Sequence, residues 1–99
     1  MIRHAALFRL RHSSGSTGEA GFLAALARLA AIPGVEDFEI ARETSLKNDF
    51  AFAVSMRFAN QAAYDAYNDH AAHVAFVADR WVPEVEDFME HDTVALDDG

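Results

Sequence analysis

Apolar and polar residues alternate along several stretches of the chain, with the period of two that is typical of β-strands. Residues 50–58 show the pattern most clearly, because large apolar side chains occupy every second position; these are Phe50, Phe52, Val54, Met56 and Phe58. Residues 2–10 alternate in the same way, with one side formed by Ile2, His4, Ala6, Phe8 and Leu10. Each stretch is therefore predicted to be a strand with one side in the core.

Two further strands are indicated by weaker patterns. The strand prediction for residues 35–43 rests on a few scattered apolar side chains more than on clean alternation. Residues 88–96 follow a Val82-Pro83 step, and proline disturbs regular backbone structure. We expect a strand in the first of these stretches and the last strand of the chain in the second.

Apolar residues three and four apart, the spacing of an amphipathic helix, appear in two other regions. The first helix is expected at residues 19–31, after a loop rich in serine and glycine, and Pro33-Gly34 ends it. A second helix is expected after Asn60, since asparagine caps helix N-termini. Asn68-Asp69 then interrupts this helix and supplies a fresh cap for a short helix that starts at His70.

The predicted order is strand, helix, strand, strand, helix, strand, which is typical of the ferredoxin-like α+β fold, an antiparallel sheet with helices on one face. No repeat or linker divides residues 1–99, so we expect one domain. The uncovered face would carry Ala5, Leu7, Ala51 and Ala53, and exposed apolar faces commonly mark interfaces. The sequence predicts a homodimer built sheet against sheet; the alternative is a monomer whose second face is merely alanine-rich.

Composition narrows the classes of partner. The formal charge of −8, from 16 acidic and 8 basic residues, repels phosphate backbones and anionic lipids, so neither nucleic acid nor a membrane is expected as a partner. The chain has no cysteine, which excludes disulfides, thiolate metal sites and a cysteine nucleophile. Its apolar runs are shorter than a membrane span. We expect a soluble, cytoplasmic protein.

Histidine supplies the candidate chemistry. His70 and His73 stand three residues apart before an apolar run, and histidine moves protons at physiological pH. A metal site would need a third ligand, for which Asp69, His91 or Asp92 are candidates, but no recognised zinc spacing is present. We therefore expect no metal and no other cofactor.

Three segments together resemble the stress-responsive dimeric α/β-barrel family, known as Dabb. They are the first strand beginning Met1-Ile-Arg-His4, the turn Ile32-Pro-Gly-Val35, and the segment Ala66-Tyr-Asn-Asp-His-Ala-Ala-His-Val-Ala-Phe76. The resemblance spans nearly the whole chain. It implies a dimer in which two ferredoxin-like sheets close into a barrel.

The resemblance extends to the plant polyketide-cyclase branch of that family, of the olivetolic acid cyclase type, which performs an intramolecular aldol condensation. Carried over residue by residue, it implies that His73 is the acid/base and that Tyr67 and His4 help to shape the pocket. The chain departs from the family pattern at Ala71, where proline is common, and at Gly21 and Ala25, where bulkier side chains line the cyclase pocket.

The residues themselves leave alternatives open. A helix dipole beginning near Asp69 favours a neutral His73, while the Asp69 and Asp79 carboxylates favour the charged form. The alternative to an acid/base role is that His73 is a half-buried histidine whose ring is satisfied by a hydrogen bond to a backbone carbonyl. Tyr67 is either a hydrogen-bond donor to a developing enolate or a packed aromatic at a helix edge, and His4 is either a pocket residue or a satisfied core histidine. His70 is expected to support the helix start, and His12 to be exposed in its loop.

A set of apolar residues is predicted to line a substrate pocket, although the same residue types build ordinary cores; the set is Phe8, Phe22, Phe52, Val54, Phe76 and Trp81. The leading hypothesis is a dimeric barrel protein that binds a small hydrophobic or aromatic molecule, and that acts, if it is an enzyme, as a cofactor-free cyclase or lyase using His73. The alternatives are a stress-related binding protein without turnover and a cofactor-independent oxygenase.

Overall fold

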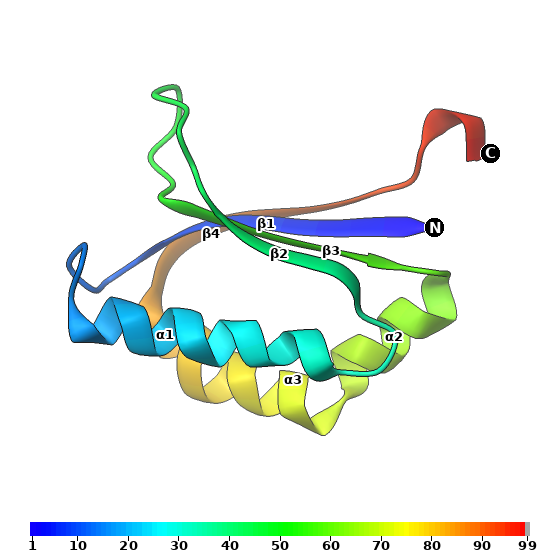
Figure 1. Ribbon diagram of the computed structural model, residues 1–99, viewed down its shortest axis with the longest axis horizontal. Helices are drawn as coiled ribbons and strands as arrows, with labels where there is room; N and C mark the ends of the chain where they lie inside the picture. The colour runs from blue at the N-terminus through cyan, green and yellow to red at the C-terminus, as the bar shows by residue number, and fades with distance from the viewer. Residues whose placement is uncertain (99) are drawn as a thin grey trace.

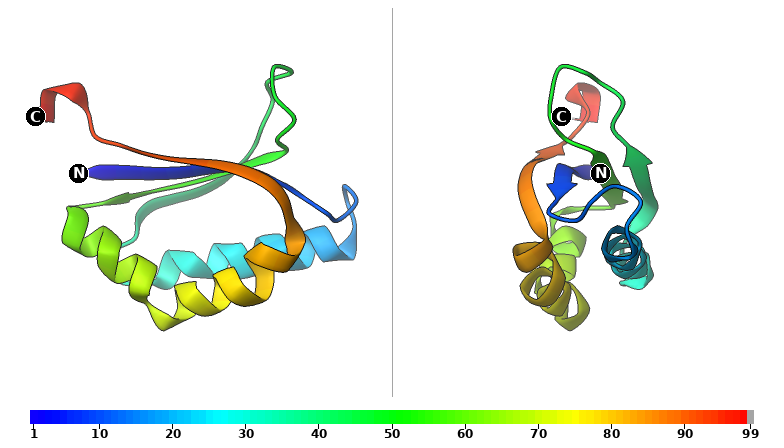
Figure 2. Two further views of the ribbon diagram at one scale, coloured as in Figure 1. Left: turned by 180° about the vertical axis from the view of Figure 1, so that it is seen from behind. Right: turned by 90° about the vertical axis from the view of Figure 1, so that its left-hand side faces the viewer.

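The computed structural model describes residues 1–98 and has the ferredoxin-like architecture that the sequence predicts (Figure 1). Four antiparallel strands in the order β2-β3-β1-β4 form one sheet, and the helices cover one of its faces (Figures 1 and 2). The elements are β1 (Ile2–Leu10), α1 (Thr17–Ala27), η1 (Arg28–Ala31), β2 (Glu36–Arg42), β3 (Phe52–Phe58), α2 (Gln61–Asp69), α3 (Ala71–Phe76), η2 (Val77–Trp81), α4 (Val82–Glu84), β4 (Val85–Thr93) and η3 (Leu96–Asp98).

The core lies between the sheet and the helices. On β1, His4, Ala6, Phe8 and Leu10 are buried while the residues between them are not, and β3 shows the same alternation. Helix α1 contributes its own buried side chains, Phe22 and Leu26. The predicted strand patterns are confirmed on these two central strands, because each has one face under the helices and one face free.

Helix starts differ from the predicted ones by one or two residues, and the caps explain why; at its end, α1 stops at Ala27 and the predicted last turn is the 3-10 segment η1. Helix α1 begins at Thr17, before the predicted start, because the Ser16 side chain accepts a hydrogen bond from the Glu19 backbone N–H. Asn60 caps α2 as expected. The cap of α3 is His70 and not Asp69, since His70 Nδ1 accepts from the Ala72 backbone N–H at 3.1 Å. His70 thus supports the helix start with its own ring.

The apolar pattern predicts the last strand at residues 88–96, three residues later than its observed position. It begins at Val85, which pairs with Leu10, and ends at Thr93, which pairs with Arg3. Glu86 and Asp87 have low strand propensity, which hides the start of the strand, but both form ion pairs with Arg9 on β1.

The weak alternation of β2 has a structural cause. Its register with β3 shifts between Glu36 and Glu39, and Asp37 within the shift has φ 50°, in the left-handed region. Such a bulge inserts an extra residue and breaks the period of two. The Asp37 side chain also accepts a hydrogen bond from Arg57 at 3.0 Å.

His12 was expected to be simply exposed, and this prediction is wrong. Its Nε2 lies 2.6 Å from Glu84 Oε1, so it joins the loop after β1 to α4. A side chain at Gly18 would collide with this histidine, because an added Cβ would lie 2.3 Å from its Nδ1. The small residue at the start of α1 therefore makes room for the contact.

The face of the sheet opposite the helices is bare within the described chain (Figure 2). Ala5, Leu7 and Ala53 lie on it and are partly exposed, whereas Ala51, which precedes β3, packs against the core. The loop between β2 and β3 and the chain after β4 both project beyond this face (Figure 1). Within residues 1–98, no helix has the length and apolar character needed to cross a bilayer.

Candidate functional site

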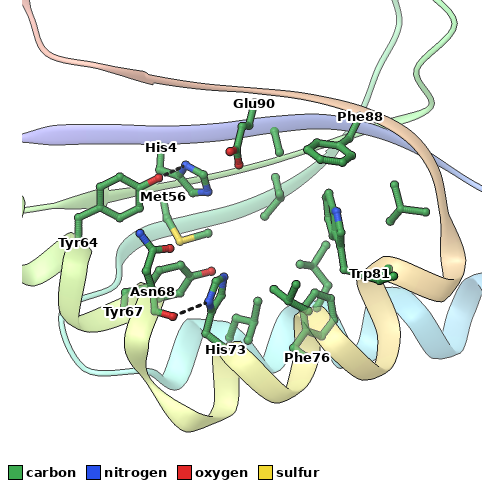
Figure 3. Close-up of a pocket in the computed structure, with 17 residues that line it drawn as sticks. His4, Met56, Tyr64, Tyr67, Asn68, His73, Phe76, Trp81, Phe88 and Glu90 are labelled. Atoms are coloured by element: carbon green, nitrogen blue, oxygen red, sulfur yellow. Dashed lines mark hydrogen bonds between the residues drawn. The ribbon is translucent and has the colours of Figure 1, made fainter.

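A cavity of about 550 Å³ lies between the sheet and the helices α2 and α3, within the range of small-molecule sites (Figure 3). The histidines, the tyrosines and Asn68 gather toward one end, and Phe76, Trp81 and Phe88 toward the other (Figure 3). The lining residues are His4, Ala6, Leu26, Leu29, Val54, Met56, Tyr64, Tyr67, Asn68, His73, Phe76, Val77, Trp81, Val82, Val85, Phe88 and Glu90. The cavity is thus an apolar chamber with one polar end.

His73 is held in one orientation by the break between α2 and α3. Its Nδ1 lies 3.2 Å from the backbone carbonyl oxygen of Asn68, the next-to-last residue of α2. A carbonyl only accepts hydrogen bonds, so Nδ1 carries the proton and donates it. In the neutral ring Nε2 is then the acceptor, and this edge of the ring faces the cavity (Figure 3).

The surroundings of His73 favour its neutral form. Burial is the largest cause that lowers its pKa from the ordinary 6.5, and His4 lowers it further. The hydrogen bond to Asn68 and the negative charge of Glu90 act in the opposite direction. The carboxylate that opposes the shift comes from β4, and not from Asp69 or Asp79 as the sequence suggested. A neutral imidazole with a free nitrogen is competent as a base.

Tyr67 packs against His73, with ring centroids 4.4 Å apart. Its side chain is 2% exposed, and burial raises its pKa, so the phenol stays protonated. Within residues 1–98 its hydroxyl makes no hydrogen bond, and Tyr67 belongs to the cavity lining. It is therefore a donor available to a bound molecule.

His4 is held in place by Asp92, which the sequence suggested only as a metal ligand. Its Nδ1 lies 2.7 Å from Asp92 Oδ1, across the β1–β4 pair. The Tyr64 hydroxyl donates to the same carboxylate, with Oδ2 at 2.9 Å, and also lies 3.0 Å from His4 Nδ1. Because Nδ1 is engaged with Asp92, the ring nitrogen of His4 that has no protein partner is Nε2, which faces the cavity (Figure 3).

The structure divides the predicted pocket residues into two groups. Val54, Phe76 and Trp81 line the cavity. Phe8, Phe22 and Phe52 do not; they lie behind it in the core, where the Phe8 ring contacts Phe22, Phe52 and Trp81 at centroid distances of 5.2–5.8 Å. Both groups occupy the same face of strands and helices, so periodicity alone does not separate a wall from the packing that supports it.

Four residues of this site were missed by sequence reasoning: Tyr64, Asn68, Glu90 and Asp92, of which Asp92 was weighed only as a metal ligand. Phe88, Glu90 and Asp92 are two apart on β4 and share the helix-covered face, pairing with Phe8, Ala6 and His4. Their spacing was a usable signal. Asn68 acts through its backbone carbonyl, which no side-chain pattern reveals.

His4, Tyr67 and His73 come together at one cavity, from β1, α2 and α3. Within residues 1–98, no group of three or more histidine, cysteine, aspartate or glutamate side chains is placed to hold a metal ion. The arrangement has an imidazole acceptor in His73, the unbonded Nε2 of His4, a phenol donor in Tyr67 and the Glu90 carboxylate beside an apolar chamber. Such a set is suited to proton transfer at a carbon or oxygen atom of a bound apolar molecule.

Comparison with known proteins places the chain in a defined group. Residues 2–95 match the model of the family described as Stress responsive A/B Barrel Domain. No protein of curated function matches the chain.

Solved structures share the whole fold. A Dabb family protein with a ferredoxin-like fold from Mesorhizobium loti is 55% identical, with 96% of each chain covered and a TM-score of 0.95. A dimeric ferredoxin-like protein of unknown function from Thermobifida fusca is 28% identical over 95% of this chain and 90% of that one, with a TM-score of 0.78. The hydroxynitrile lyase of Passiflora edulis shares the fold at 14% identity, over 95% of this chain and 92% of that one, with a TM-score of 0.83.

Proposed function

Since the chain belongs to the stress responsive A/B barrel domain family, we propose that its cavity binds a small hydrophobic or aromatic molecule and that His73 moves a proton on that molecule without a cofactor. The observation that carries this proposal is the Nε2 edge of His73, which faces an apolar cavity while Nδ1 is tied to Asn68. A packed histidine would have both nitrogens satisfied by the protein. Here one nitrogen is left for a ligand.

The chemistry follows from the placement of the groups. The apolar body of the molecule lies against Trp81 and Phe76, with an acidic C–H bond next to a carbonyl at the polar end. The Nε2 lone pair of His73 takes the proton, the C–H electrons move toward the carbonyl, and the enolate oxygen accepts a hydrogen bond from Tyr67. The imidazolium formed on His73 is stabilised by the negative charge of Glu90, which raises the pKa of that ring.

A cyclisation of the olivetolic acid cyclase type is one reaction of this class. The enolate carbon would attack a second carbonyl carbon of the same molecule, and His73 would return its proton to the alkoxide oxygen formed there, so that no external reactant is consumed. Lyase chemistry is carried on this fold by the Passiflora edulis protein, according to its name. For the present chain the support is the His73 geometry.

The proposal is tested with 5-nitrobenzisoxazole, a neutral aromatic molecule whose C–H proton is removed by a general base in a single ring-opening step. Trp81 is the chain's one tryptophan and lines the cavity, so its fluorescence reports binding. We expect the fluorescence to change saturably and the product to form faster than in buffer, with the same half-saturation. Saturable binding without turnover would contradict the catalytic part and favour a binding protein. The absence of both would overturn the whole proposal.

We also propose that the chain forms a homodimer through the bare face of its sheet. Ala5, Leu7 and Ala53 form an apolar centre on this face, with Leu7 and Ala53 directly paired between β1 and β3. Related structures from Thermobifida fusca, Bacteroides fragilis and Jannaschia are described as dimeric. An apolar, uncovered sheet face is the surface that such a dimer would bury.

Introducing a charge at the centre of this face is expected to separate the subunits. The Ala53→Glu variant places a carboxylate that a packed sheet-on-sheet interface cannot solvate, so we expect a monomer by size-exclusion chromatography with light scattering. Ala62→Glu, on the exposed side of α2, is the matched control and leaves the dimer intact. A dimer that survives Ala53→Glu at unchanged affinity would place the interface elsewhere.

A further inference from the structure

The polar end of the cavity is rich in hydrogen-bond acceptors. His4 and His73 both use Nδ1 on protein partners and turn Nε2 toward the cavity. Glu90 adds a carboxylate, whose side chain points from β4 toward the same space (Figure 3). The Tyr67 hydroxyl and the Asn68 side-chain amide are donors at the same end.

The Glu90 carboxylate gives this end of the cavity a negative charge. Among the cavity-lining residues of the described chain, Glu90 is the one with an acidic side chain, and none is a lysine or arginine. Within residues 1–98, Glu90 enters no hydrogen bond or ion pair, whereas its neighbour on the same face, Asp92, is bonded to His4 and Tyr64. Arg9, on the neighbouring strand β1, is engaged with Glu86 and Asp87.

An anionic ligand would therefore meet repulsion from Glu90, while a cation would meet this unpaired carboxylate and the Nε2 acceptor of His73. The formal charge of −8 over the whole chain adds a long-range field of the same sign. A protonated amine supplies three donors and one positive charge, which matches the acceptors at this end.

We infer that the cavity, in the binding role proposed above, selects molecules that have an apolar or aromatic body and a protonated amine at the polar end. Glu90 is the residue that recognises the amine. A hydroxyl in the same position supplies one donor and binds less tightly. A carboxylate is rejected. Glu90 thus determines specificity by its charge, in addition to its effect on His73.

Three molecules with one body and different ends test this selection: 4-phenylbutylamine, 4-phenylbutanol and 4-phenylbutanoate. Their dissociation constants are measured near neutral pH by Trp81 fluorescence and by calorimetry. We expect the amine to bind about three- to tenfold more tightly than the alcohol, as one partly exposed ion pair allows, and the carboxylate to bind more weakly than the alcohol.

The variant Glu90→Gln keeps the shape of the side chain and removes its charge. We expect it to bring the amine to the affinity of the alcohol and to leave the affinity of the alcohol within about twofold. Glu86→Gln is the matched control, because it removes the same charge from the same strand at a residue that pairs with Arg9 and does not line the cavity. The control separates the local effect of Glu90 from the field of the whole chain.

The outcomes distinguish this inference from the proposed function. Equal binding of the three molecules, tightest binding of the carboxylate, or an amine preference that persists in Glu90→Gln would overturn the role of Glu90 while leaving a ligand-binding cavity. An equal loss of the preference in Glu86→Gln would assign it to the general field and also overturn that role. If none of the three molecules perturbs Trp81, the cavity does not take such ligands and both proposals fail.

Discussion

The variant His73→Asn is expected to lose the base-catalysed opening of 5-nitrobenzisoxazole by a factor of about 100 or more, the range by which a positioned acid or base accelerates a reaction. Asparagine retains polar atoms at this site but has no basic nitrogen, so binding reported by Trp81 should change little. A loss of turnover with binding retained is the signature of a removed base. The measurement is the rate at saturating substrate for both proteins.

The matched control is His70→Asn, three residues earlier. His70 lies outside the cavity lining and caps α3, and asparagine also caps helices, so the helix start is preserved. We expect its rate to equal that of the wild type. An equal loss in the two variants, or none in His73→Asn, would remove His73 from the role of base.

The pH profile gives an independent check on the same group. The base must be unprotonated, so the rate is full above the pKa of His73 and falls as the pH drops through it. Burial lowers that pKa below the ordinary 6.5, which puts the fall on the acid side of this value. If the rate falls with decreasing pH around a midpoint above 6.5, the proton is taken by another group.

The second large effect is expected in the core behind the cavity. Phe8 is fully buried at the centre of the sheet and contacts three other aromatic rings, including that of Trp81. Removing it by Phe8→Ala leaves a cavity that its neighbours fill only in part, so we expect the free energy of unfolding to fall by about 3–5 kcal/mol. Urea denaturation followed by circular dichroism measures the change, at one protein concentration because a dimer unfolds in a concentration-dependent way.

Phe88→Ala is the matched control, because Phe88 is paired directly with Phe8 on the neighbouring strand and also contacts Trp81. Its side chain is 48% exposed and lines the cavity. We expect a loss of about 1 kcal/mol, since less apolar surface leaves water there on folding. Equal destabilisation by the two variants would mean that Phe88 is covered in the native protein, for example by a partner subunit.

The fold was readable from the sequence because two central strands, β1 and β3, carry strict alternation. Each has one face under helices and one face bare, and a period of two is the direct consequence. The edge strands were read less well for local reasons. In β2 a bulge at Asp37 breaks the period, and in β4 acidic residues are paired with Arg9, a contact across 77 positions that no local pattern contains.

The candidate site was readable in part. The segment containing Tyr67 and His73 is compact in sequence, and its resemblance to the family drew attention to both residues. Glu90 and Asp92 stand far along the chain, and their importance depends on the register of β4 against β1, which sets Asp92 opposite His4 and Glu90 opposite Ala6. The predicted pocket phenylalanines on β1, α1 and β3 lie in the core behind the cavity, because the cavity wall and the packing that supports it occupy the same face of each element.

The sequence by itself determined which side of each central strand is apolar, where the chain turns, and which residues can move a proton, because these depend on the chemistry of single residues and their near neighbours. Tertiary structure decided which nitrogen of each histidine is free. Nδ1 of His73 is hydrogen-bonded to the backbone carbonyl of Asn68, and Nδ1 of His4 is hydrogen-bonded to Asp92 across a strand pair. Hydrogen bonds of this kind are set by three-dimensional placement, so the direction in which an imidazole offers its lone pair appears only once the chain is folded.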